Sequence, residues 1–113
     1  MAPRRNPLNL NSLQLKTLTL LQELVRVSGT PEGDEARETV IRTLPDPHGD
    51  HFHLGDAIVA ARDATGLRNA GVWAALQRKG LVRPHPPDGV VLTASGWEYD
   101  TGLRDVILHR SED

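Results

Sequence analysis

A cluster of histidine and aspartate in the middle of the chain holds the residues best suited to chemistry. Within nine residues the chain places His48, Asp50, His51, His53 and Asp56. Side chains two positions apart in a strand point to the same face, so His51 and His53 are predicted to lie side by side. Imidazole and carboxylate groups are ligands of zinc and other divalent metals. The spacing therefore predicts a metal site with His48, His51 and His53 as ligands and Asp50 or Asp56 as an oxygen donor.

Three interpretations of this cluster stay open: a solvated polar face of a hairpin, a metal- or pH-sensing site on a regulator, and a catalytic metal centre. The solvated face is favoured, because the order His-Gly-Asp-His-Phe-His differs from metallohydrolase signatures and no distant ligands can be identified. Elsewhere the glycines form neither a phosphate-binding loop nor a dinucleotide fingerprint, and no nucleophile stands in a known motif. The sequence predicts that the protein is not an enzyme, with a divalent metal as the sole candidate cofactor.

The length and composition predict one folded unit. The chain has 113 residues, of which 38% are hydrophobic and 25% charged. This suits one hydrophobic core and is too balanced for a wholly disordered chain. We expect a flexible arm at residues 1–10, a single domain over 11–109 and a flexible tail at 110–113.

Cysteine usage and hydropathy bear on the compartment. There is no cysteine, which excludes disulfides and thiolate zinc sites and fits a reducing compartment. No apolar run approaches the length of a membrane span. Polar residues interrupt the leucines near the start, whereas a signal peptide has an unbroken apolar stretch there. A cytoplasmic protein without a membrane partner is predicted.

Charge is distributed unevenly along the chain. The net charge of −2 argues against a general nucleic-acid coat. Residues 32–56 hold seven acids, whereas residues 66–85 hold none and carry Arg68, Arg78, Lys79 and Arg83. One face of the protein can therefore be basic although the whole is acidic.

The first half of the chain should contain one long helix. Asn11 and Gln14 have capping-box spacing, and apolar residues then recur at helical period, which predicts a helix over residues 12–27. Leucines outnumber those that one core-facing stripe requires, which predicts a homodimer through this helix and the terminal helix. These leucines are Leu8, Leu10, Leu13, Leu15, Leu18, Leu20, Leu21 and Leu24.

The next segment has mixed signals. Glycine and proline predict a loop over residues 28–34. Residues 38–44 are rich in β-branched side chains and 51–54 alternate polar and apolar, so we expect these two runs to pair as a β-hairpin. A short helix over 34–43 is the alternative.

Two short helices joined by a tight turn are expected after this hairpin. Asp56 is a plausible N-cap of a helix that ends at Thr65-Gly66, where glycine can adopt the left-handed conformation. Residues 67–69 make the turn, and a third helix runs from about Ala70 to Lys79, ended by Gly80. This is the layout of a helix-turn-helix.

A hairpin and a last helix complete the predicted elements. Residues 81–83 and 90–92 flank a turn-forming stretch that contains Asp88-Gly89, a strong hairpin signal. Thr93 is expected to cap a last helix, broken or weakened at Gly102. One side of that helix would carry Leu103, Val106 and Ile107.

The order of these elements resembles the winged-helix family of bacterial regulators, broadly its MarR- and PadR-like members. The resemblance implies an α+β winged helix that binds double-stranded DNA and regulates transcription. Only 13 residues separate Gly66 from Gly80, fewer than in many such regulators, which predicts a shorter third helix than theirs. A winged helix that binds another protein, as an interaction module or accessory subunit, is therefore the alternative. The matching fragments are Ala64-Thr65-Gly66-Leu67, Lys79-Gly80-Leu81-Val82, Asp88-Gly89 and Leu92-Thr93-Ala94-Ser95-Gly96.

The third helix can be divided by its period. Val72, Ala75 and Leu76 should pack inward, and Trp73 at the flank should be core or interface. Outward residues on a helix are usually just solvated, but on the resemblance we assign this face to DNA. Ala70 and Ala74 would permit close approach, Gln77 would read adenine, and Arg78 would contact guanine or phosphate. Phosphates would be held by Arg68, Asn69, Lys79 and Arg83.

Overall fold

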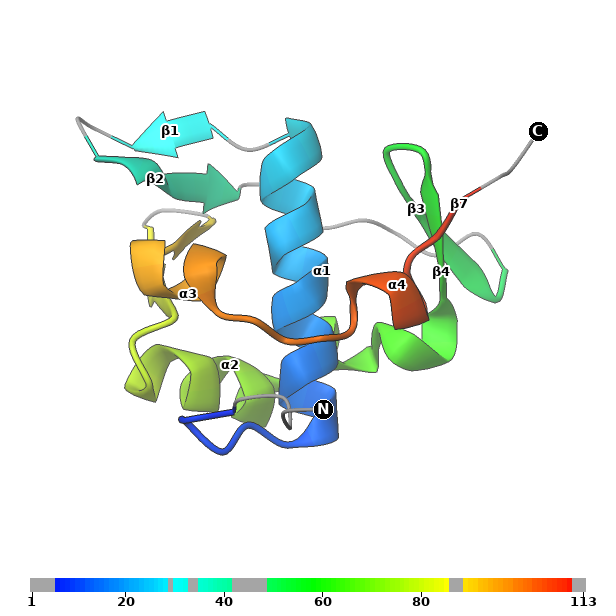
Figure 1. The fold of residues 1–113 in the computed structure, drawn as a ribbon, viewed down its shortest axis with the longest axis horizontal. Helices are drawn as coiled ribbons and strands as arrows, with labels where there is room; N and C mark the ends of the chain where they lie inside the picture. Colours follow the sequence, from blue (N-terminus) through cyan, green and yellow to red (C-terminus); the bar gives the residue numbers. More distant parts are fainter. Residues whose placement is uncertain (1–5, 29, 33–34, 42–48, 86–88, 111–113) are drawn as a thin grey trace, which may run out of the picture.

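The chain folds as a mixed α+β unit around one long helix, α1, which covers Ser12–Ser28. The computed structural model describes residues 6–28, 30–32, 35–41, 49–85 and 89–110. A four-stranded antiparallel sheet lies on one side of α1 and a three-stranded antiparallel sheet on the other (Figure 1). The predicted α+β class is thereby confirmed. No helix in the described part of the chain is both long enough and apolar enough to cross a membrane.

The predicted helix and its capping box are confirmed at the start of α1. The Asn11 amide donates to Oε1 of Gln14 at 3.0 Å, and the Gln14 amide donates to Oδ1 of Asn11 at 2.8 Å. Two amides that lack helical acceptors are thereby satisfied by neighbouring side chains. The helix start is thus specified locally, by residues three apart.

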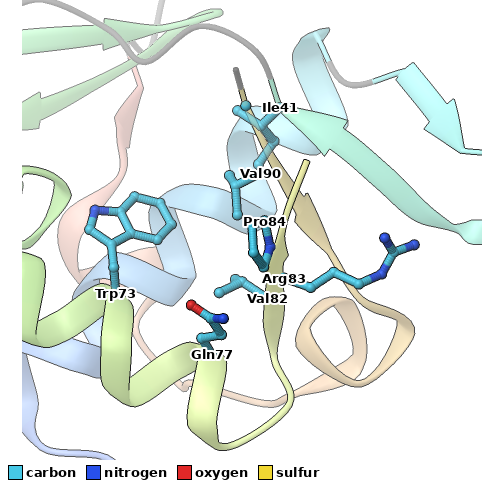
Figure 2. A pocket seen from close by; sticks show the side chains of 8 residues that line it. Ile41, Trp73, Gln77, Val82, Arg83, Pro84 and Val90 are labelled. Carbon is cyan, nitrogen blue, oxygen red and sulfur yellow. The ribbon is translucent and has the colours of Figure 1, made fainter. Parts of the chain in front are cut away.

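The larger sheet has the strand order β1-β2-β6-β5. Its strands are β1 (Thr30–Glu32), β2 (Glu35–Ile41), β5 (Val82–Pro84) and β6 (Val90–Leu92). In the register, Val40 pairs with Val91 and Ile41 with Val90, and Figure 2 shows Ile41 and Val90 close together. The hairpin of β5 and β6 is confirmed, whereas β1 lies within the stretch predicted to be a loop. The alternative helix over 34–43 is wrong, because β-branched Val40 and Ile41 are buried in strand pairing.

The smaller sheet has the order β3-β4-β7, with β3 at His51–Leu54, β4 at Ala57–Ala60 and β7 at His109–Arg110. Residues 51–54 form the predicted strand, but the predicted partner was wrong, since β3 pairs with β4 and β2 pairs with β1 and β6. Gly55, with φ of 59°, lies in the tight turn between β3 and β4.

The helix predicted to begin after Asp56 is absent. Asp56 lies in the turn that precedes β4, and the following side chains alternate: Ala57 and Val59 are buried, while Ile58 is 39% exposed. That period of two belongs to a strand. A short apolar run has no decisive period in the sequence, so pairing with β3 decided that residues 57–60 form a strand and not a helix.

Two 3-10 turns, η1 (Ala61–Asp63) and η2 (Thr65–Arg68), take the place of the expected second helix. Gly66 does not have a positive φ as predicted; it is buried in η2. A Cβ built there would lie 1.9 Å from Oγ1 of Thr17, so glycine is needed for close approach to α1. Asp63 in η1 also binds α1, with Oδ1 at 2.8 Å from Nζ of Lys16.

The predicted third helix is confirmed as α2, which covers Ala70–Arg78. Gly80 follows with φ of 78°, the left-handed conformation expected of the residue that ends a helix. The 3-10 turn η2, and not an α-helix, precedes α2 in the chain, so the helix-turn-helix layout is not formed in the predicted way.

The last predicted helix is interrupted earlier than Gly102. Thr93 caps α3 (Ala94–Glu98) as predicted, its Oγ1 accepting from the Gly96 amide, but the helix ends before Tyr99. Nε2 of Gln22 in α1 donates to the Tyr99 carbonyl at 2.8 Å, which fixes the chain in its non-helical course. In α4 (Arg104–Ile107) the predicted apolar side is wrong, because Val106 is 58% exposed and Ile107 only 1%.

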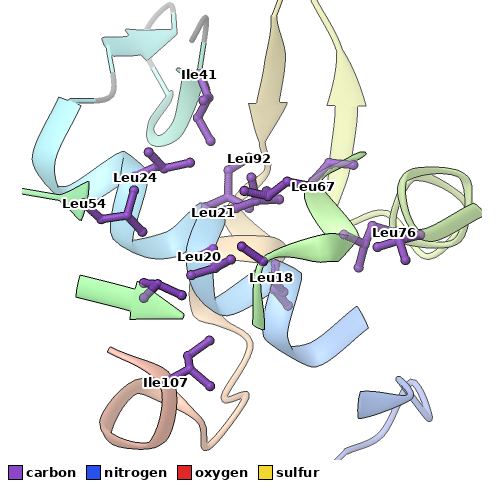
Figure 3. Packing of buried hydrophobic residues seen from close by; sticks show 14 of the residues in the cluster. Leu18, Leu20, Leu21, Leu24, Ile41, Leu54, Leu67, Leu76, Leu92 and Ile107 are labelled. Carbon is purple, nitrogen blue, oxygen red and sulfur yellow. The ribbon is translucent and has the colours of Figure 1, made fainter. Parts of the chain in front are cut away.

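The core surrounds α1 instead of lying on one of its sides. Figure 3 shows leucines of α1 among residues of both sheets, η2, α2 and α4. Every leucine that suggested a dimer is either buried in this core or packed against it. The surplus of leucines therefore serves the fold of one chain, and it gives no support to a dimer.

Both ends of the described chain contact the domain. The Leu8 amide donates to the Tyr99 hydroxyl, and that hydroxyl donates to Oδ1 of Asn6. Arg110 is in register with Ala57 in the smaller sheet. Residues 6–10 of the predicted arm are therefore attached to the domain, and residues 1–5 and 111–113 lie outside the described part.

Candidate nucleic-acid interface

The exposed face of α2 contains the four helix residues predicted to face DNA. Ala70, Ala74, Gln77 and Arg78 are all exposed. The opposite face is buried, as its period predicted, by Val72, Ala75 and Leu76. The face is held in place because its inward side chains are part of the core.

Asn69 has a different role from the predicted phosphate contact. Its Oδ1 accepts hydrogen bonds from the amides of Gly71 at 2.9 Å and Val72 at 3.2 Å. This is an N-cap, which stabilises a helix start by satisfying amides that have no helical acceptor. The exposed Arg68, one residue earlier, lies at the same end of the helix.

Lys79 also has an intramolecular partner. Its ammonium donates to the Leu8 carbonyl and so ties the segment before α1 to the end of α2. An ammonium group has further donors, but this contact restrains the side chain. Lys79 therefore has a structural role. The sequence could not indicate this role, because the partner of Lys79 is 71 positions away.

A groove of about 360 Å³ separates α2 from the hairpin of β5 and β6. Figure 2 shows Gln77 and Trp73 on its helix side and Arg83 among the residues of its strand side. Trp73 is half-buried, and its Nε1 donates to the Leu67 carbonyl at 2.9 Å, in agreement with its predicted structural role. The groove is lined by Ile41, Trp73, Gln77, Val82, Arg83, Pro84, Gly89 and Val90.

The predicted neighbours His51 and His53 do lie together on β3. Their Nε2 atoms are 3.1 Å apart, and Nδ1 of His51 is 3.4 Å from Oδ1 of Asp50. Asp56 instead lies toward α1, with Oδ1 3.9 Å from Nη2 of Arg26. His48, the third predicted ligand, lies outside the described residues.

Metal ligation by three or more side chains finds no support where the structure is described. In those ranges no group of three histidines or acids is close enough to hold a metal. The expected oxygen donor Asp56 is separated from the pair by the turn after β3. What the described residues supply is a pair of imidazoles, one of them beside a carboxylate.

A buried carboxylate on α1 is a further ionisable feature of the described residues. Glu23 is only 2% exposed and forms hydrogen bonds with Arg26. The pKa of the Arg26 guanidinium is raised, chiefly by this hydrogen bonding and by attraction to the Glu23 carboxylate. Arg26 therefore stays charged, and its contacts with Glu23 link side chains three positions apart at the end of α1.

Sequence patterns found the outward face of α2 and the histidine pair, because both depend on local periodicity. They missed Ile41 and Val90 as walls of the groove, since only strand pairing brings those residues to α2. They also missed the N-cap at Asn69, although asparagine directly before a predicted helix is a cap signal.

Searches of known protein families, curated proteins and solved structures found no match to this chain.

Proposed function

We propose that the protein is a winged-helix regulator that binds double-stranded DNA, with α2 as the recognition helix and β5–β6 as the wing. The sheet order β2-β6-β5 and the position of α2 directly before β5 support this assignment. In this reading η2 replaces the second helix of a helix-turn-helix. The observation that carries the proposal is the exposed face of α2 with Gln77 and Arg78, beside the groove that Gln77 lines together with the wing residue Arg83. No acid lies between residues 64 and 85.

The size of α2 suits a shallow insertion into the major groove. The nine residues of α2 extend over roughly 13 Å, and the major groove of B-DNA is about 12 Å wide. Ala70 and Ala74 carry only methyl groups and would let the helix backbone approach the DNA closely. Two and a half turns of helix would bring one or two side chains to base edges.

The side chains on this face have the right chemistry for base and phosphate contacts. Gln77 can pair with an adenine edge and Arg78 with guanine, each good contact contributing about 1–3 kcal/mol of discrimination. Arg68 and Arg83, at the start of α2 and on β5, would bind phosphates on either side. Lys79 is left out of the proposed interface because of its contact with Leu8.

The test is binding of the protein to random duplex DNA, followed by fluorescence anisotropy at low and moderate salt. The Arg78→Ala/Arg83→Ala variant is compared with Arg62→Ala/Arg104→Ala, which removes the same charge from exposed positions on η1 and α4. We expect micromolar binding that weakens with salt, is lost in the first variant and persists in the second. Equal loss in both variants would mean that only total charge matters, and would contradict a defined interface.

A second candidate function is supported by the groove beside α2. Trp73, Val82 and Val90 give it an apolar lining, which is more typical of contact with a protein than with phosphates. The net charge of −2 also fits this alternative. Absence of DNA binding even at low salt would favour a winged-helix interaction module over a DNA-binding regulator.

Homodimer formation is not needed for this proposal. The leucines that suggested it lie in or against the core of a single chain. A homodimer stays a prediction, and light scattering at micromolar concentration checks it directly. A monomer would limit the proposed regulator to contacts from one recognition helix.

A further inference from the structure

The two histidines of β3 present their ring nitrogens to each other. Nε2 of His51 and Nε2 of His53 are 3.1 Å apart, and the two rings are nearly perpendicular, at 73°. A metal bound to histidine lies about 2.0–2.1 Å from each nitrogen. Two such nitrogens are roughly 3.4 Å apart at a tetrahedral angle and roughly 2.9 Å at a right angle, so the observed separation already fits joint ligation.

The strand holds these two side chains in position. Phe52 and Leu54, which alternate with the histidines, are buried and point to the other side of the sheet. All four residues of β3 are in register with β4, His51 opposite Ala60 and His53 opposite Ile58. The backbone under the pair is therefore anchored by the core, and binding would require little reorganisation.

Asp50 favours the tautomer that metal binding needs. Its Oδ1 is 3.4 Å from Nδ1 of His51, a position in which the carboxylate attracts a proton on Nδ1. A neutral imidazole with its proton on Nδ1 has an unprotonated Nε2. A carboxylate behind a metal-binding histidine has this role in many metal sites. Nε2 of His51 is thereby directed toward His53 as an electron-pair donor.

We propose that His51 and His53 bind one divalent transition-metal ion, such as Zn²⁺, Ni²⁺ or Cu²⁺, through their two Nε2 atoms. The contact that His53 now makes with His51 would be replaced by the metal, with the proton of His53 on Nδ1. Because the described residues supply only these two nitrogens, water or another oxygen donor would complete the coordination. Such an open site should bind more weakly than a closed structural zinc site and follow the order Cu²⁺ above Ni²⁺ and Zn²⁺.

This site is independent of the proposed DNA interface. It lies on the smaller sheet, whereas the wing strands β5 and β6 belong to the larger sheet and α2 directly precedes β5. Failure of DNA binding would therefore leave the metal proposal unaffected, and failure of metal binding would leave the DNA proposal unaffected.

The experiment is titration of the tag-free protein with Cu²⁺ and, separately, with Zn²⁺, followed by isothermal calorimetry. His51→Gln and His53→Gln are compared with His109→Gln, which removes an exposed histidine from β7 of the same sheet. We expect binding of one ion per chain, weakened about tenfold or more in either β3 variant and unchanged in the control. Circular dichroism would verify that all three variants fold.

Three results would overturn the proposal. One is binding in His51→Gln and His53→Gln that equals the wild type, because then neither nitrogen is a ligand. Another is binding that weakens equally in the His109→Gln control, since any surface histidine would then suffice. The third is absence of binding to the wild type at millimolar Cu²⁺.

Discussion

Gly66 and Thr17 approach so closely that a Cβ on Gly66 would lie 1.9 Å from Oγ1 of Thr17 and 3.2 Å from its Cβ. Thr17 is completely buried on α1, and its Oγ1 also donates to the Leu13 carbonyl at 2.8 Å. The contact presses the 3-10 turn η2 against α1, directly before the residue that caps α2. The position of the proposed recognition helix thus depends on a buried glycine that lies outside the proposed DNA interface.

We expect Gly66→Ala to destabilise the protein by about 1–3 kcal/mol, because the added methyl group must displace Thr17 or the turn. Denaturant unfolding followed by circular dichroism measures this change. Thr17→Ala in the same chain removes Oγ1 and should recover part of the loss. Additive effects of the two substitutions would contradict direct contact between these residues.

Asn69→Ala should destabilise the protein by about 1 kcal/mol, because the amides of Gly71 and Val72 lose their acceptor. Thermal unfolding checks this, with Asn69→Ser as the matched control that keeps a capping oxygen. We expect Asn69→Ser to retain most of the stability. If Asn69→Ala unfolded like the wild type, the cap would have no energetic importance, and a role in phosphate binding would regain weight.

Leu76 and Gln77 are neighbours in sequence with opposite expected effects. Leu76 is fully buried, so Leu76→Ala should cost about 2–5 kcal/mol, whereas Gln77→Ala on the exposed face should stay within about 0.5 kcal/mol. Denaturant unfolding measures both variants. If Gln77→Ala lowered DNA discrimination at unchanged stability, its effect would belong to the interface and not to folding.

Tyr99→Phe should loosen the segment before α1 while leaving the core in place. The phenol hydroxyl accepts from the Leu8 amide at 3.2 Å and donates to Asn6, and phenylalanine retains only the ring. The expected loss is about 0.5–1.5 kcal/mol per hydrogen bond, and the Leu8 amide should exchange faster with solvent. Amide exchange measured by NMR would show this, and unchanged protection of Leu8 would argue that the segment is held by packing alone.

The salt dependence of DNA binding gives a further prediction. If Arg83 neutralises one phosphate, Arg83→Ala should lower the steepness of the plot of log K against log salt by about 0.9. The control Arg62→Ala should leave that slope unchanged. Anisotropy titrations at several salt concentrations give both slopes, and an identical change in the two variants would speak against a defined phosphate contact.

Elements with local signals were predictable from the sequence. The cap at Asn11 and Gln14, the period of α1 and α2, the stop at Gly80 and the hairpin before Thr93 all depend on residues within a few positions of each other. The histidine pair was predictable for the same reason, because residues two apart on a strand share a face. These features also located the exposed face of α2.

Only the tertiary structure decided which strands pair and which short segments become helices. Residues 57–60 are an apolar run that suits a buried helix or a strand equally well, and pairing with β3 and β7 made it a strand. Gly66 serves close approach to Thr17, and Lys79 bonds to Leu8, through partners 49 and 71 positions away. Contacts over such distances depend on how the whole chain packs around α1, and no local pattern of residues encodes them.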